Sequence, residues 1–431
     1  MIWSLELVVI TSSLLVLLFS GMWAPFAIGA LGATFLILKM GPSGLKAMGL
    51  ISWGSVNSFQ LAAVPLFILM AEILLKSGLA DRVYRGITPL ASRLSGGLLQ
   101  TNIIGCGIFS AISGSSTATA AAIGTVSLPQ LKSQGYNSSI SAGSLAAGGT
   151  LGILIPPSIP LIIYSTFAEI SAAKLFIAGI GPGIALVFLF CGYIAVVAIT
   201  SEKIAPKKYA LEPINWNRSI SDLSPFLLLI LLVLGSIYLG IATPTEAAAV
   251  GCLGSFLIGR IWGKLGILEF RRATRATVKT TGAIMLLVMM AFVFSYAIAI
   301  TGIPKQLAFW VGTQDMTAFT LMLLIGVVYL LMGCVIDSIG MMVITVPLLL
   351  PIVEAFGIDP ILFGIMVVLY IEIGLITPPI GLNLFIIHSL YPEGKFLTVI
   401  KGAIPFVFLL LAMVVLVWSL PEVALWLPAR M

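Results

Sequence analysis

The sequence predicts an all-α, polytopic membrane protein, and three observations support this fold class. Of its 431 residues, 60% are hydrophobic and only 9% are charged, whereas a soluble domain carries roughly 25% charged residues. Apolar runs recur along the whole chain, and several approach the roughly 20 residues that a membrane-spanning helix needs. Glycine and proline landmarks recur in the same order in the two halves. A chain of this composition cannot cover itself with a polar surface, so its surface must face lipid.

The first half begins with an apolar run at 3–20. This run lacks the positive n-region of a signal peptide, so we expect it to be retained as the first helix. Further apolar runs follow at 22–38, 58–75, 98–112, 118–131, 140–155, 158–168 and 174–200. Several of these runs are too short to cross a bilayer alone. We take residues 1–200 as the first structural unit.

A polar stretch at 201–223 divides the chain near its middle and predicts a cytoplasmic linker. The second unit, 224–431, has apolar runs at 224–240, 243–258, 280–300, 318–335, 338–353, 359–376, 378–391 and 397–420. Landmarks match between the units: Gly105-Cys106 with Gly333-Cys334, Leu128-Pro129 with Leu350-Pro351, and Pro156-Pro157 with Pro378-Pro379. An ordered series of such matches is typical of an internal repeat.

Basic residues predict the orientation of the two units. Lys and Arg cluster at 76–93, 203–218 and 260–279, and the positive-inside rule places these segments in the cytoplasm. In this topology, 98–131 enters and leaves from the cytoplasmic side as a re-entrant hairpin, whereas 318–353 does so from the opposite side. Equivalent segments then have opposite orientations, so the repeat is inverted. Inverted repeats with short, Gly- and Pro-interrupted apolar segments are typical of secondary transporters.

The first hairpin turns at Ser113–Ser116, a run of three serines and a glycine without charge. A hairpin tip in the membrane leaves backbone groups unpaired, which is tolerated only where protein, water or a ligand satisfies them. Hydroxyl and carbonyl oxygens suit a small hard cation such as Na⁺, and helix N-termini favour an anionic group. Tight packing of small residues is the alternative, above all for Thr117, Thr119 and the alanines that follow.

Two apolar segments carry paired prolines: 140–168 breaks at Pro156-Pro157, and 359–391 breaks at Pro378-Pro379. Proline removes a backbone donor and disrupts a helix, and the neighbouring glycines loosen the backbone. A broken helix exposes carbonyl oxygens at membrane depth, where they can coordinate a cation. A simple structural kink is the alternative explanation.

Asp337 lies inside the apolar run of the second hairpin. An ionisable residue at membrane depth is a functional-site hypothesis by default, so Asp337 could bind a cation or orient a neighbour. It could equally cap the second arm of the hairpin, and the two roles are compatible. His388 is the only histidine, which disfavours both a histidine proton relay and a Ser-His hydrolase.

Together these segments resemble the large membrane subunit of TRAP transporters, the DctM type, over nearly the whole chain. The resemblance rests on GCGIFSAISGSSTATAAAIG, LAAGGTLGILIPPSIPLIIY, GIATPTEAAAVG, GCVIDSIGMMVITVPLLLPI and GLITPPIGLNLF. It implies a Na⁺-driven importer of an organic acid, such as a C4-dicarboxylate or sialic acid, in the bacterial inner membrane. It also implies an elevator mechanism, in which a transport domain with two hairpins moves against a scaffold. The implied partners are a small four-helix membrane subunit and a periplasmic substrate-binding protein.

The resemblance further implies which residues hold the coupling ion and the substrate. One sodium site would combine the first tip and the first break, namely Ser113, Gly114, Ser115, Ser116, Gly149, Thr150 and Pro156. The other would combine the second tip and the second break, namely Asp337, Ser338, Gly340, Gly374, Thr377 and Pro378. Substrate would lie between them, near Ser115, Ser158, Asp337 and Asn383. No organic cofactor and no transition metal are expected.

The runner-up function is a stand-alone organic-anion transporter of a related hairpin fold, coupled to H⁺ or Na⁺. A membrane-embedded enzyme and a passive channel are further alternatives, although opposed hairpins around broken helices suit alternating access better than a continuous pore. The net charge of +6 comes without a nucleic-acid-binding module, so we expect no nucleic-acid partner.

Overall fold

The computed structural model describes residues 2–201, 204, 215–314, 316–333, 336–391 and 394–431, and every regular element within them is a helix. The predicted all-α class is therefore confirmed. The first half contains α1 (Ile2–Phe19), α2 (Ala24–Met40), α3 (Ser43–Val56), α4 (Ala63–Lys76), α5 (Leu79–Ala91), α6 (Leu98–Ser113), α7 (Ser116–Ser133), α8 (Ser138–Leu154), α9 (Ile159–Phe167) and α10 (Ala172–Thr200). The second half contains α11 (Trp216–Tyr238), α12 (Pro244–Ile261), α13 (Ile267–Thr301), α14 (Ile303–Gly312), α15 (Ala318–Gly333), α16 (Ser338–Ala355), α17 (Pro360–Leu375), α18 (Leu382–Leu390), α19 (Phe396–Ser419), α20 (Glu422–Leu425) and the 3₁₀ turn η1 (Pro428–Arg430).

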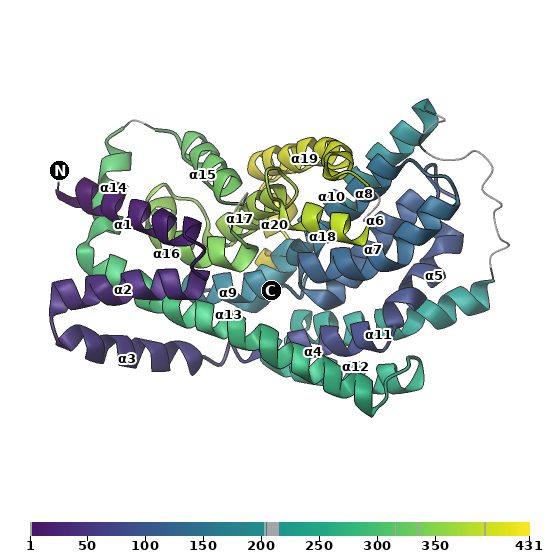
Figure 1. The fold of residues 1–431 in the computed structure, drawn as a ribbon, viewed down its shortest axis with the longest axis horizontal. Coiled ribbons are helices and arrows are strands. Elements are labelled where there is room, and N and C mark those ends of the chain that lie inside the picture. Colours follow the sequence, from purple (N-terminus) through teal and green to yellow (C-terminus); the bar gives the residue numbers. More distant parts are fainter. Residues whose placement is uncertain (1, 202–203, 205–214, 315, 334–335, 392–393) are drawn as a thin grey trace.

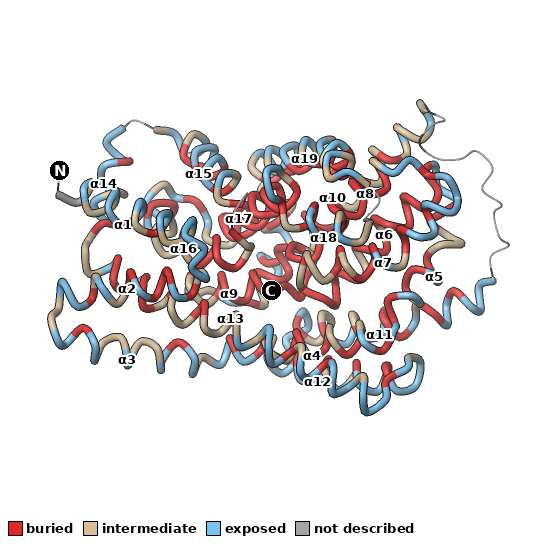
Figure 2. Tube along the Cα trace, in the orientation of Figure 1, coloured by how far each residue is buried: buried red, intermediate tan, exposed pale blue. Residues whose placement is uncertain are grey.

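Helix length and burial agree with a membrane environment. Five helices of the described chain are long and apolar enough to cross a membrane, and the number rises to seven if each of two bent helix pairs counts as one span. Outer helices carry large exposed apolar side chains such as Leu38, Phe188 and Leu231. Figure 2 shows that exposed positions follow the outer helices while buried positions gather between them. Lipid is the solvent that suits such a surface.

Two groups of helices lie against each other (Figure 1). One group, which we call the frame, comprises α2, α3, α4, α11, α12 and α13; in it α13 packs on α2, α3 and α4, and α12 packs on α4 and α11. The other group, which we call the hairpin bundle, comprises α6–α10 and α15–α19. At its centre α8 packs on α6, α7, α18 and α19, and α17 packs on α15 and α19. Both α8 and α17 are buried along almost their whole length, so they form the core of the bundle.

Both predicted hairpins are present as helix pairs that pack on each other, α6 with α7 and α15 with α16. The first turns at Gly114, whose φ of 60° lies in the left-handed region, and α7 begins after the N-cap Ser115. In the second, α16 begins directly after the N-cap Asp337. Cys334, at the predicted second tip, lies outside the described residues. The opposite membrane orientation of the two hairpins stays a prediction.

Both predicted helix breaks are also present. The first separates α8, which ends at Leu154, from α9, and the two helices are bent by 41°. The second separates α17 from α18, which begins at Leu382. The prolines of each pair have no N–H to continue a helical hydrogen-bond ladder. Both Pro-Pro peptide bonds are cis.

The structure contains several helices that the apolar runs did not predict, because segments with interspersed polar residues do not form continuous apolar runs. Helices α3, α5 and α14 are additional elements, as are the short α20 and η1 near the C-terminal end of the sequence. In α5, Arg82 and Arg85 point to the frame, where they pair with Asp222 of α11 at 3.4 and 3.3 Å. The linker predicted for 201–223 is shorter, since α11 already begins at Trp216.

Candidate functional site

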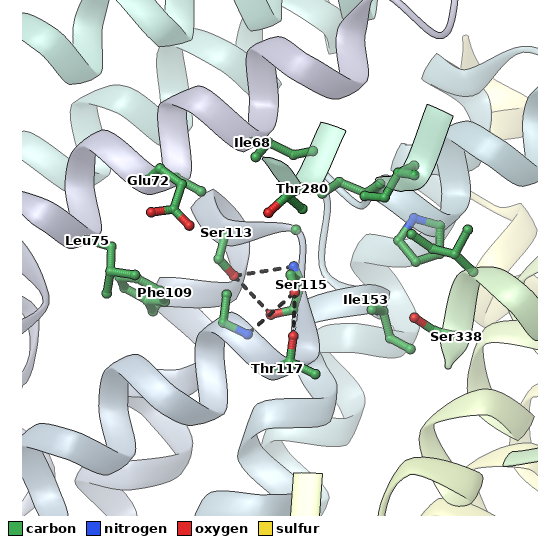
Figure 3. Close-up of a pocket in the computed structure, with 17 residues that line it drawn as sticks. Ile68, Glu72, Leu75, Phe109, Ser113, Ser115, Thr117, Ile153, Thr280 and Ser338 are labelled. Carbon is green, nitrogen blue, oxygen red and sulfur yellow. Dashed lines mark hydrogen bonds between the residues drawn. The ribbon is translucent and has the colours of Figure 1, made fainter. Parts of the chain in front are cut away.

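A cavity of about 320 Å³ lies where the frame meets the hairpin bundle. Its frame side comes from α4 and α13, and its bundle side comes from the first hairpin tip and the starts of α9 and α16. Figure 3 shows these elements around the cavity. The lining residues of the described chain include one carboxylate and several hydroxyls, but no Lys, Arg or His.

Hydroxyl groups form a network at the first hairpin tip (Figure 3). The Oγ of Ser113 and the Oγ1 of Thr119 lie 2.5 Å apart, and the Oγ of Ser115 lies 3.1 Å from the Oγ1 of Thr117. The Oγ of Ser115 also accepts a hydrogen bond from the backbone N–H of Ala118 at 3.4 Å, so it caps α7. The tip therefore presents neutral oxygen atoms, which are the ligands that hard cations prefer.

Gly114 joins the first tip to the first break. Its carbonyl oxygen accepts a hydrogen bond from the N–H of Ile159 at 3.3 Å. A Cβ atom at this position would lie only 2.6 Å from the carbonyl oxygen of Pro157. Because its φ is also +60°, glycine meets both the conformational and the spatial requirement. The tip and the break predicted to form one site therefore meet at this glycine.

Ser158 lies inside the first break and does not line the cavity. Its hydroxyl donates to the carbonyl oxygen of Ile153 at 2.6 Å and accepts from the N–H of Leu161 at 3.4 Å. Ser158 is fully buried and caps α9. Its neighbours Ile159 and Pro160 are the residues that reach the cavity wall. The Ser158 hydroxyl is thus engaged with backbone groups of the break, and its assignment to the substrate stays a prediction.

Asp337 caps the second arm of the second hairpin. Its Oδ2 accepts hydrogen bonds from the N–H groups of Ile339 and Gly340, at 3.2 and 3.4 Å. A Cβ atom on Gly340 would lie 2.8 Å from the Oδ1 of Asp337, so this glycine leaves room for the carboxylate. Ser338, the first residue of α16, lines the cavity. Asp337 therefore caps α16, and in the sequence it directly precedes Ser338, a residue of the cavity lining.

Three helix N-termini meet at this cavity. Thr117 belongs to the first turn of α7, Ile159 begins α9, and Ser338 begins α16. The N–H groups of a first helical turn have no acceptor within their own helix, and the aligned peptide dipoles place positive charge there. Ser116, the buried first residue of α7, contributes such an N–H group. Several first-turn N–H groups of these helices already have acceptors within the protein. The positive ends of the helix dipoles, rather than a set of free N–H groups, would therefore favour an anionic group of a ligand here.

The frame contributes two polar residues that the sequence analysis did not assign to the site. Figure 3 shows the carboxylate of Glu72, on α4, and the hydroxyl of Thr280, on α13, on the side that faces Ser113 and Ser115. The Oε2 of Glu72 lies 3.7 Å from the Nζ of Lys76, one turn further along α4. The position of Glu72 within the apolar run 58–75 could have identified it as a candidate site residue, whereas nothing in the sequence distinguishes Thr280.

Gly149 and Asn383 lie together, but away from the cavity. A Cβ atom on Gly149 would lie 2.6 Å from the Cβ of Ala120 on α7 and 3.2 Å from the Nδ2 of Asn383. The Nδ2 of Asn383 donates to the carbonyl oxygen of Ala146 at 3.1 Å. Its Oδ1 is buried without a hydrogen-bond partner in the described chain. This cluster joins α7, α8 and α18 behind the first tip.

The remaining predicted sodium ligands also lie outside the cavity lining. The hydroxyl of Thr150 donates to the carbonyl oxygen of Ala147 within α8 at 2.8 Å, and that of Thr377, just after α17, donates to the carbonyl oxygen of Ile373 at 2.6 Å. Gly374 allows the backbone of α17 to pack closely on α15. Pro156 is buried, whereas Pro378 is exposed. Their assignment to sodium sites stays a prediction. Across the described residues, no three His, Cys, Asp or Glu side chains form a metal-binding group.

A family model described as "Tripartite ATP-independent periplasmic transporter, DctM component" matches residues 11–423. The chain belongs to the DctM family. This DctM-family chain is 33% identical over 401 residues to the C4-dicarboxylate TRAP transporter large permease protein DctM of Pseudomonas aeruginosa, covering 92% of this chain and 93% of that protein. It is 32% identical over 417 residues to the sialic acid TRAP transporter large permease protein SiaM of Vibrio cholerae, covering 96% of each. It is 31% identical over 384 residues to the ectoine TRAP transporter large permease protein TeaC of Halomonas elongata, covering 86% and 87%.

A solved structure shares the DctM-family fold seen here. The YdaH transporter of Alcanivorax borkumensis superposes with a TM-score of 0.63 at 17% identity, covering 95% of this chain and 98% of that one. The resemblance predicted from the sequence is thus confirmed. The chain is a TRAP transporter large permease and a multi-pass membrane protein.

Proposed function

We propose that this DctM-family chain is the large permease subunit of a Na⁺-coupled, binding-protein-dependent importer of an organic acid in the bacterial inner membrane. The observation that carries the proposal is the composition of the cavity. Three helix N-termini and the hydroxyls of the first tip line it, together with Glu72 but with no basic side chain among the lining residues of the described chain. Relatives named for C4-dicarboxylate, sialic acid and ectoine support a small organic acid as substrate.

The same composition supports coupling to a cation. Helix N-termini attract the carboxylate of a substrate, but Glu72 at the wall and Asp337 beside it repel a second negative charge. A Na⁺ ion held by neutral oxygens near Ser113 and Ser115 would offset that repulsion. Substrate and cation would then bind well only together, which is the thermodynamic requirement for coupled transport.

The position of the cavity supports an elevator mechanism. One wall belongs to the frame, and the other belongs to the hairpin bundle. A sliding movement of the bundle along α4 and α13 would carry the tips and their ligands past a fixed wall. By family membership, a small membrane subunit and a periplasmic binding protein would complete the transporter.

Uptake by proteoliposomes tests the proposed function. The chain would be co-reconstituted with the small membrane subunit and supplied with the cognate binding protein. A thermal-shift screen that includes succinate, N-acetylneuraminate and ectoine would first identify the ligand of that binding protein. We expect uptake only with an inward Na⁺ gradient and with the binding protein present. Uptake that persists after either is removed would contradict the proposal and favour a stand-alone transporter. Conversion of the ligand without transmembrane movement would favour an enzyme.

A further inference from the structure

The N-terminal part of α13 carries a stripe of basic residues, which we call the α13 stripe: Arg271, Arg272, Arg275 and Lys279. All four are exposed. At 3.6 residues per turn, they fall on one side of the helix. The residues of this part of α13 that are buried, Ala273 and Thr277, fall on the opposite side. The stripe therefore points away from the protein.

Among the described residues, the charges of the stripe have no ion-pair partner. None of the four side chains forms an ion pair or a side-chain hydrogen bond recorded for the described chain. The nearby Glu269 does not neutralise the stripe. Its Oε2 accepts a hydrogen bond from the N–H of Gly266 at 3.1 Å, and the residue lies on another side of the helix. By contrast, Arg82 and Arg85 of α5 are paired with Asp222. The stripe is a concentration of uncompensated positive charge.

The length of α13 places the stripe at the membrane surface. A helix of 35 residues is about 52 Å long, whereas the hydrocarbon core is about 30 Å thick. The apolar part of α13 follows Lys279, so the preceding turns extend into the headgroup layer on the predicted cytoplasmic side. The exposed Val278 and the open side of Gly282 continue the same face into the apolar part. The stripe thus lies next to a lipid-facing surface of the same helix, on its predicted cytoplasmic side.

The corner between α12 and α13 adds apolar side chains to these charges. Ile267 is 90% exposed, Leu268 is 56% exposed, and Trp262 is 37% exposed. Exposed apolar side chains would be unfavourable in bulk water, but they are typical of helices that lie in the membrane interface beside basic residues. Arg260 and Lys264 stand at the same corner and are also exposed.

We propose that the α13 stripe is a binding site for the headgroups of anionic phospholipids and that it anchors the frame to the cytoplasmic leaflet. Clusters of four or more basic residues beside a membrane helix attract anionic lipid. Lipid is favoured over a protein partner because the stripe continues a lipid-facing helix surface and is flanked by interfacial side chains. The anchoring would hold the frame still while the hairpin bundle moves.

Nanodiscs of two lipid compositions test this site. The full chain with its small subunit would be placed in phosphatidylcholine alone or with phosphatidylglycerol, and its melting temperature and its lipids retained in native mass spectrometry would be measured. Preferential binding to the folded state stabilises it, so we expect phosphatidylglycerol to raise the melting temperature by about 3 °C or more. Arg271→Gln with Arg275→Gln should remove at least half of this increase and reduce the retained phosphatidylglycerol.

A matched control removes the same charge elsewhere. Lys395→Gln with Lys401→Gln changes two exposed basic residues of the hairpin bundle and should leave the lipid effect unchanged. An equal loss in both double variants, or no difference between the two lipids in the wild type, would overturn the proposal. Loss of the small subunit from the stripe variant during purification would also overturn it and identify the stripe as a protein interface.

Discussion

The two hairpin tips meet the same structural requirement with different chemistry. Each tip must cap the second arm of its hairpin, because first-turn N–H groups have no partner in their own helix. The first tip uses the neutral hydroxyl of Ser115 within a network of hydroxyls. The second uses the carboxylate of Asp337, which accepts two N–H hydrogen bonds. The helix breaks also differ. Pro156 in the first break is buried, whereas Pro378 in the second break is exposed.

This difference indicates a division of roles between the halves. The first tip is packed against its break through Gly114 and offers oxygen ligands without charge. The second tip brings a negative charge close to the cavity. In our account, the first tip holds a cation by neutral oxygens, and Asp337 makes the cavity favour that cation over a lone anion. Substitutions at the two tips should therefore have different effects.

The largest effect is expected for Gly114→Ala. A left-handed φ costs a residue with a Cβ about 1–2 kcal/mol, and the new Cβ would also meet the carbonyl oxygen of Pro157 at 2.6 Å. We expect uptake to fall by about tenfold or more, with a lower melting temperature. Gly135→Ala is the matched control, since Gly135 has a φ of +75° but open space around it. Equal losses in both variants would show that the contact with the break has no special role.

Asp337→Asn separates the capping role from the charge. Asparagine caps a helix about as well as aspartate, so the melting temperature should stay nearly unchanged. Loss of the charge should raise the Na⁺ concentration for half-maximal uptake by about tenfold, because a carboxylate near the cavity favours a bound cation. Asp337→Ala should in addition lose about 1 kcal/mol of stability with the cap. If Asp337→Asn keeps the wild-type Na⁺ dependence, the charge of Asp337 has no part in cation binding and the residue acts only as a helix cap.

Ser115→Ala should have an intermediate effect at the first tip. It removes one hydroxyl oxygen from the cavity lining and the cap of α7, so we expect uptake to fall about three- to tenfold with a weaker Na⁺ dependence. Ser158→Ala is the comparison, because that hydroxyl is hydrogen-bonded inside the break. It should lower the melting temperature without altering the Na⁺ dependence. If Ser158→Ala changes the Na⁺ dependence and Ser115→Ala lowers only the melting temperature, Ser158 rather than Ser115 contributes to cation binding.

The smallest effect is expected for Glu72→Gln on the frame side. The carboxylate is half-buried and near Lys76, so its influence on a bound anion is partly screened. Removing its charge should strengthen substrate binding at low Na⁺ by about two- to fivefold and leave the melting temperature nearly unchanged. The measurement is the substrate concentration for half-maximal uptake at several Na⁺ concentrations. Weaker binding in Glu72→Gln would instead make Glu72 a ligand of the cation.

The sequence predicted the hairpins and breaks well because their causes are local. Gly114 permits the turn, Ser115 and Asp337 cap the arms, and paired prolines end α8 and α17 near where they occur. The wall formed by Glu72 and Thr280 depends instead on how two distant helices approach the tips. No local pattern encodes such an approach.

Side-chain direction was equally difficult to predict. Ser158 and Thr377 have the residue types of ligands, but each hydroxyl donates to a backbone carbonyl. The acceptor for Ser158 is Ile153 of α8, across the break, and the acceptor for Thr377 is Ile373 of α17. Asn383 faces α8 rather than the cavity. The sequence alone therefore predicted segments that border the cavity, and tertiary packing decided which of their side chains reach it.

The most direct test of the central claim is a dual-label flux measurement on the wild-type transporter. Proteoliposomes would receive ²²Na⁺ and the radiolabelled ligand of the cognate binding protein together, and both initial rates would be recorded with the membrane potential clamped. A cavity that binds an anion only with a cation predicts a fixed, non-zero ratio of Na⁺ to substrate and no substrate flux in choline. Substrate flux that continues in choline without accompanying Na⁺ would contradict the account.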